Sequence, residues 1–530
     1  MRSTYIWILI TAVLIIAVIM IGDIDRMVAV RTFALGLGAS AIALPLGVLI
    51  AWVCHAKGFL PRTLLLISLG LVFVPLFIHV TAWDSAFGKL GWISSQSKAL
   101  TPLLTGWSAA IWIHGLAAAP QVGLLLWFGM AAGGRAYEEQ ALMDASRSTV
   151  FWRITLRRLL PLIALAAVWI FVTCSREIAV TDIYQIGTLA EQIYLGYSSG
   201  QMGGSWTPEQ IVAAQTTSWI LTAALVFTLT LATISIGQYY FIETSNSSSI
   251  ETRDSVLHTP STAKNIVAVC LLLLIAVVPF ANLLIRGSFF VESVNGQPTP
   301  GYSLEHLGNA LHTIVTKNQS ELIWSSLISV AASTLLVVVG VFAGWFARGS
   351  KTLRWALLLS IAIACATPGP LIGTLIVKLF TAVDIGFVAW LFDRTIAPAV
   401  LAVFIFCWPL SSVLIWFNLR NTATDALEHA TLEGAGGFTR LFRIGIAANW
   451  AALVGCWLIS FAICFGELSA SHMTIPPGID TVPRLALGWL HAGVNEMTAA
   501  LTIVTVALIV GVSALGWFLF RLKESQNNRQ

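Results

Sequence analysis

Residues 323–347 read IWSSLISVAASTLLVVVGVFAGWFA, and this stretch decides the fold class. It holds no charged side chain, and as a helix it exceeds the about 20 residues needed to cross roughly 30 Å of hydrocarbon. Similar apolar stretches recur along the whole chain. We predict twelve membrane spans, at about residues 4–22, 30–54, 60–82, 103–132, 160–181, 215–242, 265–285, 323–347, 353–380, 396–419, 450–471 and 497–520.

The overall composition supports this interpretation. Of the 530 residues, 57% are hydrophobic and 10% are charged, against roughly 25% charged in soluble domains. Backbone that faces lipid must satisfy its hydrogen bonds internally, and there is no alternating barrel pattern, so the spans should be helices. We therefore predict an all-α polytopic membrane protein.

The first span needs a separate decision, because an N-terminal apolar stretch can also be a signal peptide. Gly22-Asp23 follows it in place of a small-x-small cleavage site, so we expect an uncleaved first helix. A removed signal peptide, the alternative, would leave eleven spans.

The positive charges test the orientation of the spans. With both termini in the cytoplasm, 19 of the 29 lysines and arginines lie in or beside cytoplasmic segments, as the positive-inside rule requires. The small net charge of +4 follows from this topology and indicates no nucleic-acid partner. We predict a multi-pass membrane protein with both termini in the cytoplasm.

A polar stretch divides the spans into two sets of six. Residues 243–264 are rich in Ser, Thr and Asn and cannot bury enough apolar surface to fold alone. We predict a first half at 1–242, a cytoplasmic linker at 243–264 and a second half at 265–530. Gly47 and Trp52 recur as Gly340 and Trp345, 293 residues later, which indicates a duplication.

Two cytoplasmic segments repeat one another 290 residues apart. The first contains Glu138, Glu139, Ala141, Asp144, Ala145 and Phe151, and the second contains Glu428, Ala430, Glu433, Gly434, Ala435 and Leu441. An acidic residue favours the positive end of a short helix dipole. Gly434 accepts positive φ at low cost, so we expect a turn there. Asp144, at the equivalent position, tolerates a left-handed conformation better than most residues.

These segments resemble the Glu-Ala-Ala loop of ABC-importer permeases, E-A-A-x-x-x-G-A followed by apolar residues at fixed offsets. Two copies suggest a fused type I permease of the cell inner membrane, with both halves of the pore in one chain. The resemblance implies that each loop is a coupling helix seated in a cleft of a cytoplasmic ABC ATPase. Two ATPase copies would carry ATP and Mg²⁺, this chain would hold no cofactor and do no catalysis, and an extracytoplasmic substrate-binding protein would deliver the cargo.

Two glutamates also repeat at the offset of 290, each near the outer end of the span after a loop: Glu177 and Glu467. An ionisable group at membrane depth costs about 2.5–3.5 kcal/mol on insertion scales, so it usually faces a cavity or a partner. We predict that this pair, with Asp182 and His472, contacts a cationic cargo. The alternative is that Glu177 pairs with Arg176 and that both glutamates cap helices or hold the gate by hydrogen bonds.

The segment around Glu467 narrows the resemblance. Gly466-Glu467-Leu468-Ser469-Ala470, with the segments 475–481 and 491–496, is similar to the region joining the last two spans of fused ferric-iron permeases. This implies ferric iron as the cargo. Thiamine, polyamine and oxyanion permeases belong to the same broad group and remain alternatives, and no metal ligand is assigned.

A different class of function also remains open. An ion-coupled secondary transporter with 6+6 repeats would need no ATPase and would be expected to carry more intramembrane carboxylates than this sequence has. No nucleotide-binding domain is present in the sequence, so an ABC transporter would need ATP hydrolysis on other subunits. The seven cysteines lie in or beside apolar spans without a C-x-x-C pair, which favours packing roles.

Overall fold

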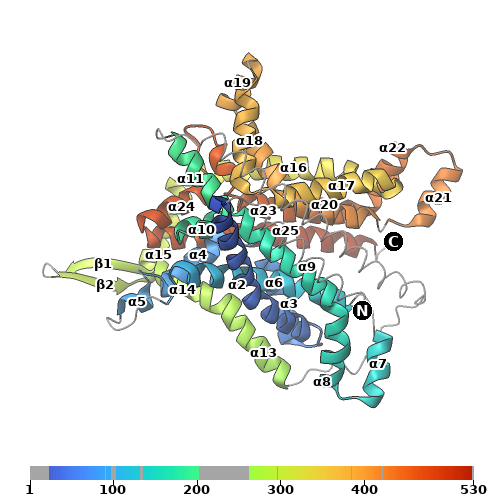
Figure 1. The fold of residues 1–530 in the computed structure, drawn as a ribbon, viewed down its shortest axis with the longest axis horizontal. Coiled ribbons are helices and arrows are strands. Elements are labelled where there is room, and N and C mark those ends of the chain that lie inside the picture. The colour runs from blue at the N-terminus through green and yellow to red at the C-terminus, as the bar shows by residue number, and fades with distance from the viewer. Residues whose placement is uncertain are drawn as a thin grey trace. The chain divides into compact units, whose positions relative to one another are not determined.

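The computed structural model describes residues 23–89, 91–96, 103–131, 135–201, 262–294, 297–383, 385–420 and 422–527. This part of the chain is almost entirely helical, with one two-stranded antiparallel sheet (Figure 1). The fold is therefore the predicted all-α polytopic membrane class. The predicted spans at 4–22 and 215–242, and all but the last three residues of the predicted linker, lie outside the described residues.

The helices of the first part of the chain are α2 (Asp23–Cys54), α3 (Phe59–Leu71), α4 (Leu76–Phe87), α5 (Trp92–Gln96), α6 (Gly106–Ala131), α7 (Arg135–Asp144), α8 (Arg147–Val150), α9 (Leu156–Arg176), α10 (Ala179–Ile183) and α11 (Leu189–Gln201). A π-helical turn at Phe151–Thr155 joins α8 to α9.

The later elements are α13 (Thr262–Leu272), α14 (Val278–Gly287), β1 (Phe289–Val294), β2 (Gln297–Tyr302), α15 (Leu304–Lys317), α16 (Gln319–Gly349), α17 (Lys351–Ala366), α18 (Gly369–Thr381), α19 (Gly386–Arg394), α20 (Ala397–Arg420), α21 (Thr424–Leu432), α22 (Gly437–Arg440), α23 (Ala447–Phe465), α24 (Val482–Ala492) and α25 (Asn495–Asn527). π-helical turns at Leu273–Val277 and Leu441–Ile446 and a 3₁₀ turn at Ser471–Met473 complete the helical elements among the described residues.

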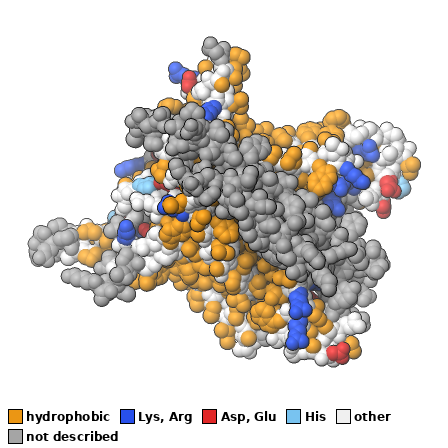
Figure 2. All heavy atoms as spheres, viewed as in Figure 1, with side chains coloured by type: hydrophobic (Ala, Val, Ile, Leu, Met, Phe, Trp, Pro, Cys, Tyr) orange, Lys and Arg blue, Asp and Glu red, His pale blue; other side chains and the backbone are white. Residues whose placement is uncertain are grey.

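Ten of the twelve predicted spans fall on described residues, and each coincides with a helix or helix pair of suitable length. Within this part, eight single helices are long and apolar enough to cross a membrane, and two bent pairs raise the number to as many as ten. Their apolar side chains are widely exposed, as Figure 2 shows over the described surface. Leu37 and Leu66, for example, are more than 60% exposed, as expected of side chains solvated by lipid.

The two bent pairs occupy equivalent places in the sequence repeat. One is α3 with α4, bent by 111°, and the other is α17 with α18, bent by 105°. Pro75 directly precedes α4 and Pro368 directly precedes α18, 293 residues later. A residue before proline avoids the helical region, so each proline ends one helix and lets the next begin in a new direction. The predicted spans at 60–82 and 353–380 are thus broken where we expected continuous helices.

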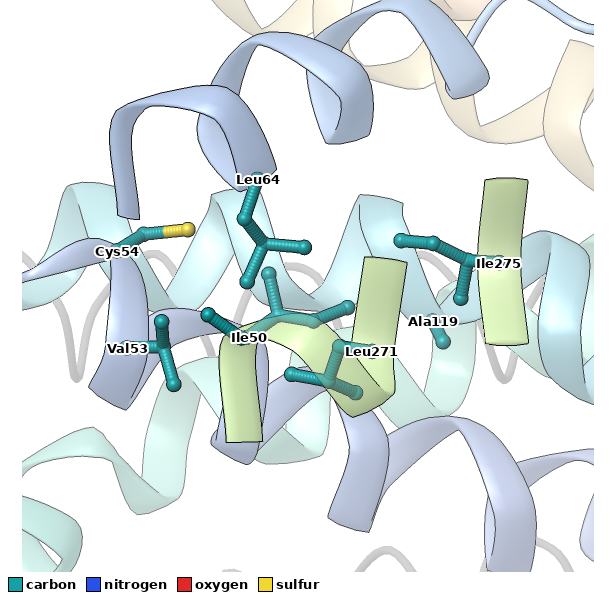
Figure 3. Close-up of a cluster of buried hydrophobic side chains, with 8 residues drawn as sticks. Ile50, Val53, Cys54, Leu64, Ala119, Leu271 and Ile275 are labelled. Atoms are coloured by element: carbon teal, nitrogen blue, oxygen red, sulfur yellow. The ribbon is translucent and has the colours of Figure 1, made fainter. Parts of the chain in front are cut away.

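The chain forms two compact units, which we describe separately. Among the described residues, unit 1 comprises residues 23–72, 76–192 and 262–302, and unit 2 comprises residues 73–75, 193–201 and 303–527. The helix that opens the second sequence half, α13, therefore packs into unit 1. Figure 3 shows this contact as a buried cluster in which Leu271 and Ile275 meet Ile50 of α2 and Leu64 of α3.

In unit 2, the long helices α16, α20 and α23 pack against one another around a buried cluster that includes Val341, Ile415 and Leu453. A second cluster joins Ile372 of α18 to Ala402 of α20 and to Ala470, which precedes the 3₁₀ turn. These contacts hold the loop after α20 and the segment after α23, where the predicted functional residues lie.

Candidate functional site

The two predicted coupling loops fold alike. Helix α7 is followed by a turn, by α8 and by the π-helical turn Phe151–Thr155, which leads into α9. Helix α21 is followed by a turn, by α22 and by the π-helical turn Leu441–Ile446, which leads into α23. The π-helical turns begin at Phe151 and Leu441, 290 residues apart, so the offset read from the sequence is also an offset in structure.

The turn in the second loop lies where the sequence placed it. Gly434 has a φ of 80°, and the backbone N–H of Ala435 donates to the carbonyl of Ala430, which closes the end of α21. The first loop differs. Asp144 ends α7 without a positive φ, since Gln185 is the one non-glycine residue with positive φ in the described part of the chain. Asp144 therefore does not adopt the left-handed conformation that an aspartate tolerates, because α7 extends to this position.

The acidic residue of the first loop lies inside the protein. Glu138 is 4% exposed, and its Oε1 accepts a hydrogen bond of 2.7 Å from the hydroxyl of Thr155. Nη2 of Arg158 lies 3.4 Å from the same oxygen. Glu138 therefore ties α7 to the base of α9. The backbone of Glu139 lies in α7, Ala141, Ala145 and Phe151 are half-buried, and Asp144 is exposed.

The second loop is more open. Glu428 and Glu433 are exposed, Ala430 and Ala435 are half-buried, and none of the residues of α21 is buried. Leu441 is fully buried in the cluster around Ile415 and anchors the loop to the spans. Figure 2 shows charged side chains at α21 and α22, and others at α7 and α8.

Glu177 is buried, with 6% exposure, at the end of α9. Its Oε1 lies 2.9 Å from Nε2 of His114, which α6 contributes. Its Oε2 accepts a hydrogen bond of 3.2 Å from the backbone N–H of Val180 at the start of α10. The carboxylate thus joins α6 to the N-terminal end of α10.

Glu467 has an equivalent arrangement after α23. It is 7% exposed, and its two carboxylate oxygens accept hydrogen bonds of 2.6 and 3.0 Å from the backbone N–H groups of Ala470 and Ser471. Both glutamates therefore bind the backbone of the short helical turn that follows them, the geometry of the capping alternative. Contact of either glutamate with cargo stays a prediction.

Asp182 lies near a carboxylate that the sequence reasoning missed. Asp182 of α10 is 9% exposed, and Glu191 of α11 is 3% exposed. Burial and the nearby carboxylates of Asp182 and Glu177 raise the pKa of Glu191 to about 8. The sequence signal was weak, because α11 is a short helix outside the spans and nothing in its local pattern marks one glutamate as buried.

His472, the last predicted pathway residue, lies in the 3₁₀ turn of unit 2. Its Nε2 is 3.4 Å from the hydroxyl of Tyr194, and the two rings meet edge to face with centroids 5.4 Å apart. Tyr194 belongs to α11 and is a second residue that sequence reasoning did not select. Glu467 and His472 both lie in the short segment after α23, and Glu177 and Asp182 share the segment after α9.

The amino-acid sequence is similar to those of several known transport permeases. No model of a known protein family matches the chain. It is 26% identical over 196 residues to the putrescine transport system permease protein PotI of Escherichia coli K12, a match that covers 37% of this chain and 68% of that protein. It is 29% identical over 248 residues to the "Putative 2-aminoethylphosphonate transport system permease protein PhnV" of Salmonella paratyphi A, covering 46% of this chain and 89% of that protein.

A third relative is the spermidine/putrescine transport system permease protein PotC of Escherichia coli K12, 26% identical over 144 residues, which are 27% of this chain and 51% of that protein. The three proteins share the description of transport system permease with different named substrates. Together with the apolar spans and the repeated loop, these similarities relate the chain to the permease subunits of binding-protein-dependent ABC importers, which are multi-pass membrane proteins and not themselves enzymes.

Proposed function

We propose that this chain is a fused permease that supplies both halves of the pore of an ATP-driven importer. It would sit in the inner membrane with both termini in the cytoplasm and receive its cargo from an extracytoplasmic binding protein. Two cytoplasmic ATPase subunits, which would carry ATP and Mg²⁺, would bind the two coupling loops. Their closure would turn the pore from inward to outward access by favouring one of two conformations.

One observation carries this proposal: the same helix, turn, helix and π-helical turn occur twice, 290 residues apart, each at the base of a span. A single loop of this shape could be a simple connection between spans. Two copies in register fit a pair of docking elements for a pair of motor subunits.

Affinity purification of the tagged chain from its native membranes, with mass spectrometry of the bound proteins, tests the proposal. An ABC ATPase should be recovered with the wild-type chain and lost with Glu428→Arg, which reverses the charge of an exposed loop residue. Recovery of the chain alone, under conditions that preserve known ABC complexes, would favour the ion-coupled secondary transporter, whose uptake Glu428→Arg should leave largely intact.

For the cargo, we propose a small amine ahead of ferric iron. The relatives named above are permeases for putrescine, for spermidine and putrescine, and for 2-aminoethylphosphonate, all of which carry a cationic ammonium group. The proposal of ferric iron as cargo rests on the sequence of the segment around Glu467, and none of these relatives is named as an iron permease. Permeases for thiamine and for oxyanions also belong to the group that the sequence resembles, so these cargoes remain alternatives.

Uptake assays with radiolabelled putrescine and ferric iron separate the two cargoes. The variant that combines Glu177→Gln and Glu467→Gln tests the predicted pathway in the same assay. If the double variant, expressed at the wild-type level, keeps full uptake, neither glutamate contacts the cargo through its charge, and capping remains as their role.

A further inference from the structure

The two coupling loops differ in how their equivalent glutamates are held. In the first loop, Glu138 is buried and bound by Thr155 and Arg158. These partners lie 17 and 20 residues further along the chain, at the end of the π-helical turn and the start of α9. Removing one partner of such a buried group is strongly destabilising, because it leaves a buried charge without compensation. The first loop is therefore braced by its own chain.

The second loop lacks both bracing groups. At the offset of 290, Gly445 stands in the place of Thr155 and Ala448 in the place of Arg158. Glu428, the equivalent of Glu138, is exposed, and its side chain makes no hydrogen bond or ion pair with the described residues. No residue of the nine-residue helix α21 is buried, and isolated helices this short are marginal in water. Contact with a partner protein would therefore stabilise this loop.

The net charges of the loops differ in the same sense. Residues 135–158 contain five arginines and three acidic residues, a net charge of +2, and one of these arginines is already paired with Glu138. Residues 424–448 contain two arginines and three acidic residues, a net charge of −1 with His429 neutral. The second loop thus presents an unpaired carboxylate on a slightly acidic surface, which complements a basic surface.

We propose that the two loops bind the ATPase by different means. The first loop docks as a rigid element, because Glu138 is bound by residues of its own chain. In the second loop, Glu428 is available to bind a basic side chain of the ATPase subunit that contacts this loop. Arginine fits this role best, because its planar guanidinium meets a carboxylate with two parallel hydrogen bonds. This inference rests on the proposed function for its partner, while the brace around Glu138 is a property of the chain alone.

Two measurements on matched variants test the proposal. The unfolding temperature of the purified chain, without ATPase, should fall for Glu138→Gln and for Arg158→Leu, and the double variant should lose no more than the larger single effect. Glu428→Gln should leave the unfolding temperature unchanged but weaken retention of the ATPase from native membranes about tenfold, since a charge-assisted hydrogen bond is lost.

A variant that adds a partner for Glu428 tests the proposal without destabilising the chain. Ala448 is exposed, so Ala448→Arg should fold normally and place a guanidinium where the first loop has Arg158. It should engage Glu428 within the chain and reduce retention of the ATPase, and Ala448→Gln serves as its neutral control.

The contrary outcomes are distinct. If Glu428→Gln and Ala448→Arg retain the ATPase as the wild type does, the proposed role of Glu428 is overturned and the permease function stands. If Glu138→Gln and Arg158→Leu unfold at the wild-type temperature, the brace is overturned. A wild-type chain that retains no ATPase would overturn the proposed function together with this docking proposal.

Discussion

Gly445 lies against the indole ring of Trp345, so that a Cβ atom at this glycine would come within 2.6 Å of the ring carbon Cζ3. Trp345 belongs to α16, and Gly445 to the π-helical turn after the second coupling loop. The contact fixes the base of that loop to a long span. A side chain at this position, such as the threonine that the first copy has at Thr155, would require the ring to move.

Replacing Gly445 by alanine should therefore destabilise unit 2. The ring must move to admit the methyl group, and overpacking of this kind costs about 1–3 kcal/mol. Thermal unfolding of the purified variant measures the effect. Gly455→Ala is the matched control, because no atom lies within 4 Å of its Cβ position and alanine favours the helix there. Equal unfolding temperatures for the two variants would mean that Trp345 does not restrict this site.

Gly434→Ala should distort the end of α21. The φ of 80° at Gly434 costs an L-residue about 1–2 kcal/mol, whereas the space around it is open, so the penalty comes from the backbone alone. We expect weaker retention of the ATPase and little change in unfolding of the spans. Gly436→Ala, at a φ of −65° and with open space around it, is the control and should behave as the wild type.

Glu177→Ala should destabilise unit 1 strongly. It removes the ion-pair partner of His114 and the acceptor of the Val180 N–H, and breaking a buried pair from one side typically costs about 3–5 kcal/mol. The double variant His114→Leu/Glu177→Leu leaves no buried charge from this pair and should recover part of the loss in a thermal-unfolding assay. A double variant less stable than Glu177→Ala would show that the pair is not the source of the effect.

Glu191 should make the stability of unit 1 depend on pH. Its folded pKa of about 8 is above the ordinary value of 4.5, so the folded state binds the extra proton more tightly. The contribution is complete below about pH 4.5, declines as the pH rises, and is lost once the pH passes about 8. Unfolding temperatures measured from pH 5 to pH 9 should fall for the wild type.

Glu191→Gln is neutral at every pH and should flatten that dependence, and it should be more stable than the wild type near pH 8. Glu305→Gln, which removes an exposed carboxylate from α15 of unit 2, is the control and should keep the wild-type slope. An unchanged slope in Glu191→Gln would assign the pH dependence to other groups.

Much of the fold followed from local sequence, because the signals that fix spans and turns are themselves local. The stretch 323–347 lies within α16, and Gly434 adopts the turn expected of it. The breaks at Pro75 and Pro368 were readable in principle from the proline rule, but the hydropathy of 60–82 and 353–380 runs through them and hides the bend.

The candidate site was less predictable, since it depends on residues that are distant along the chain. Glu138 and Glu428 are equivalent in the sequence pattern, and the same expectation was attached to both. They differ in exposure because Thr155 and Arg158 contact Glu138, and these contacts form only when α9 has packed next to α7. Glu191 is similar, because its burial beside Asp182 depends on how α10 and α11 meet.

The sequence by itself determined that this protein lies in a membrane, where its spans are and that it has two equivalent loops. These follow from long apolar stretches and from a repeat at a constant offset, which need no knowledge of packing. The tertiary structure alone decided how far the two proline-interrupted spans bend, which unit α13 joins, and which of two like glutamates is enclosed. Those outcomes depend on the free energy of bringing charged and apolar groups together from distant parts of the chain, and no local pattern records it.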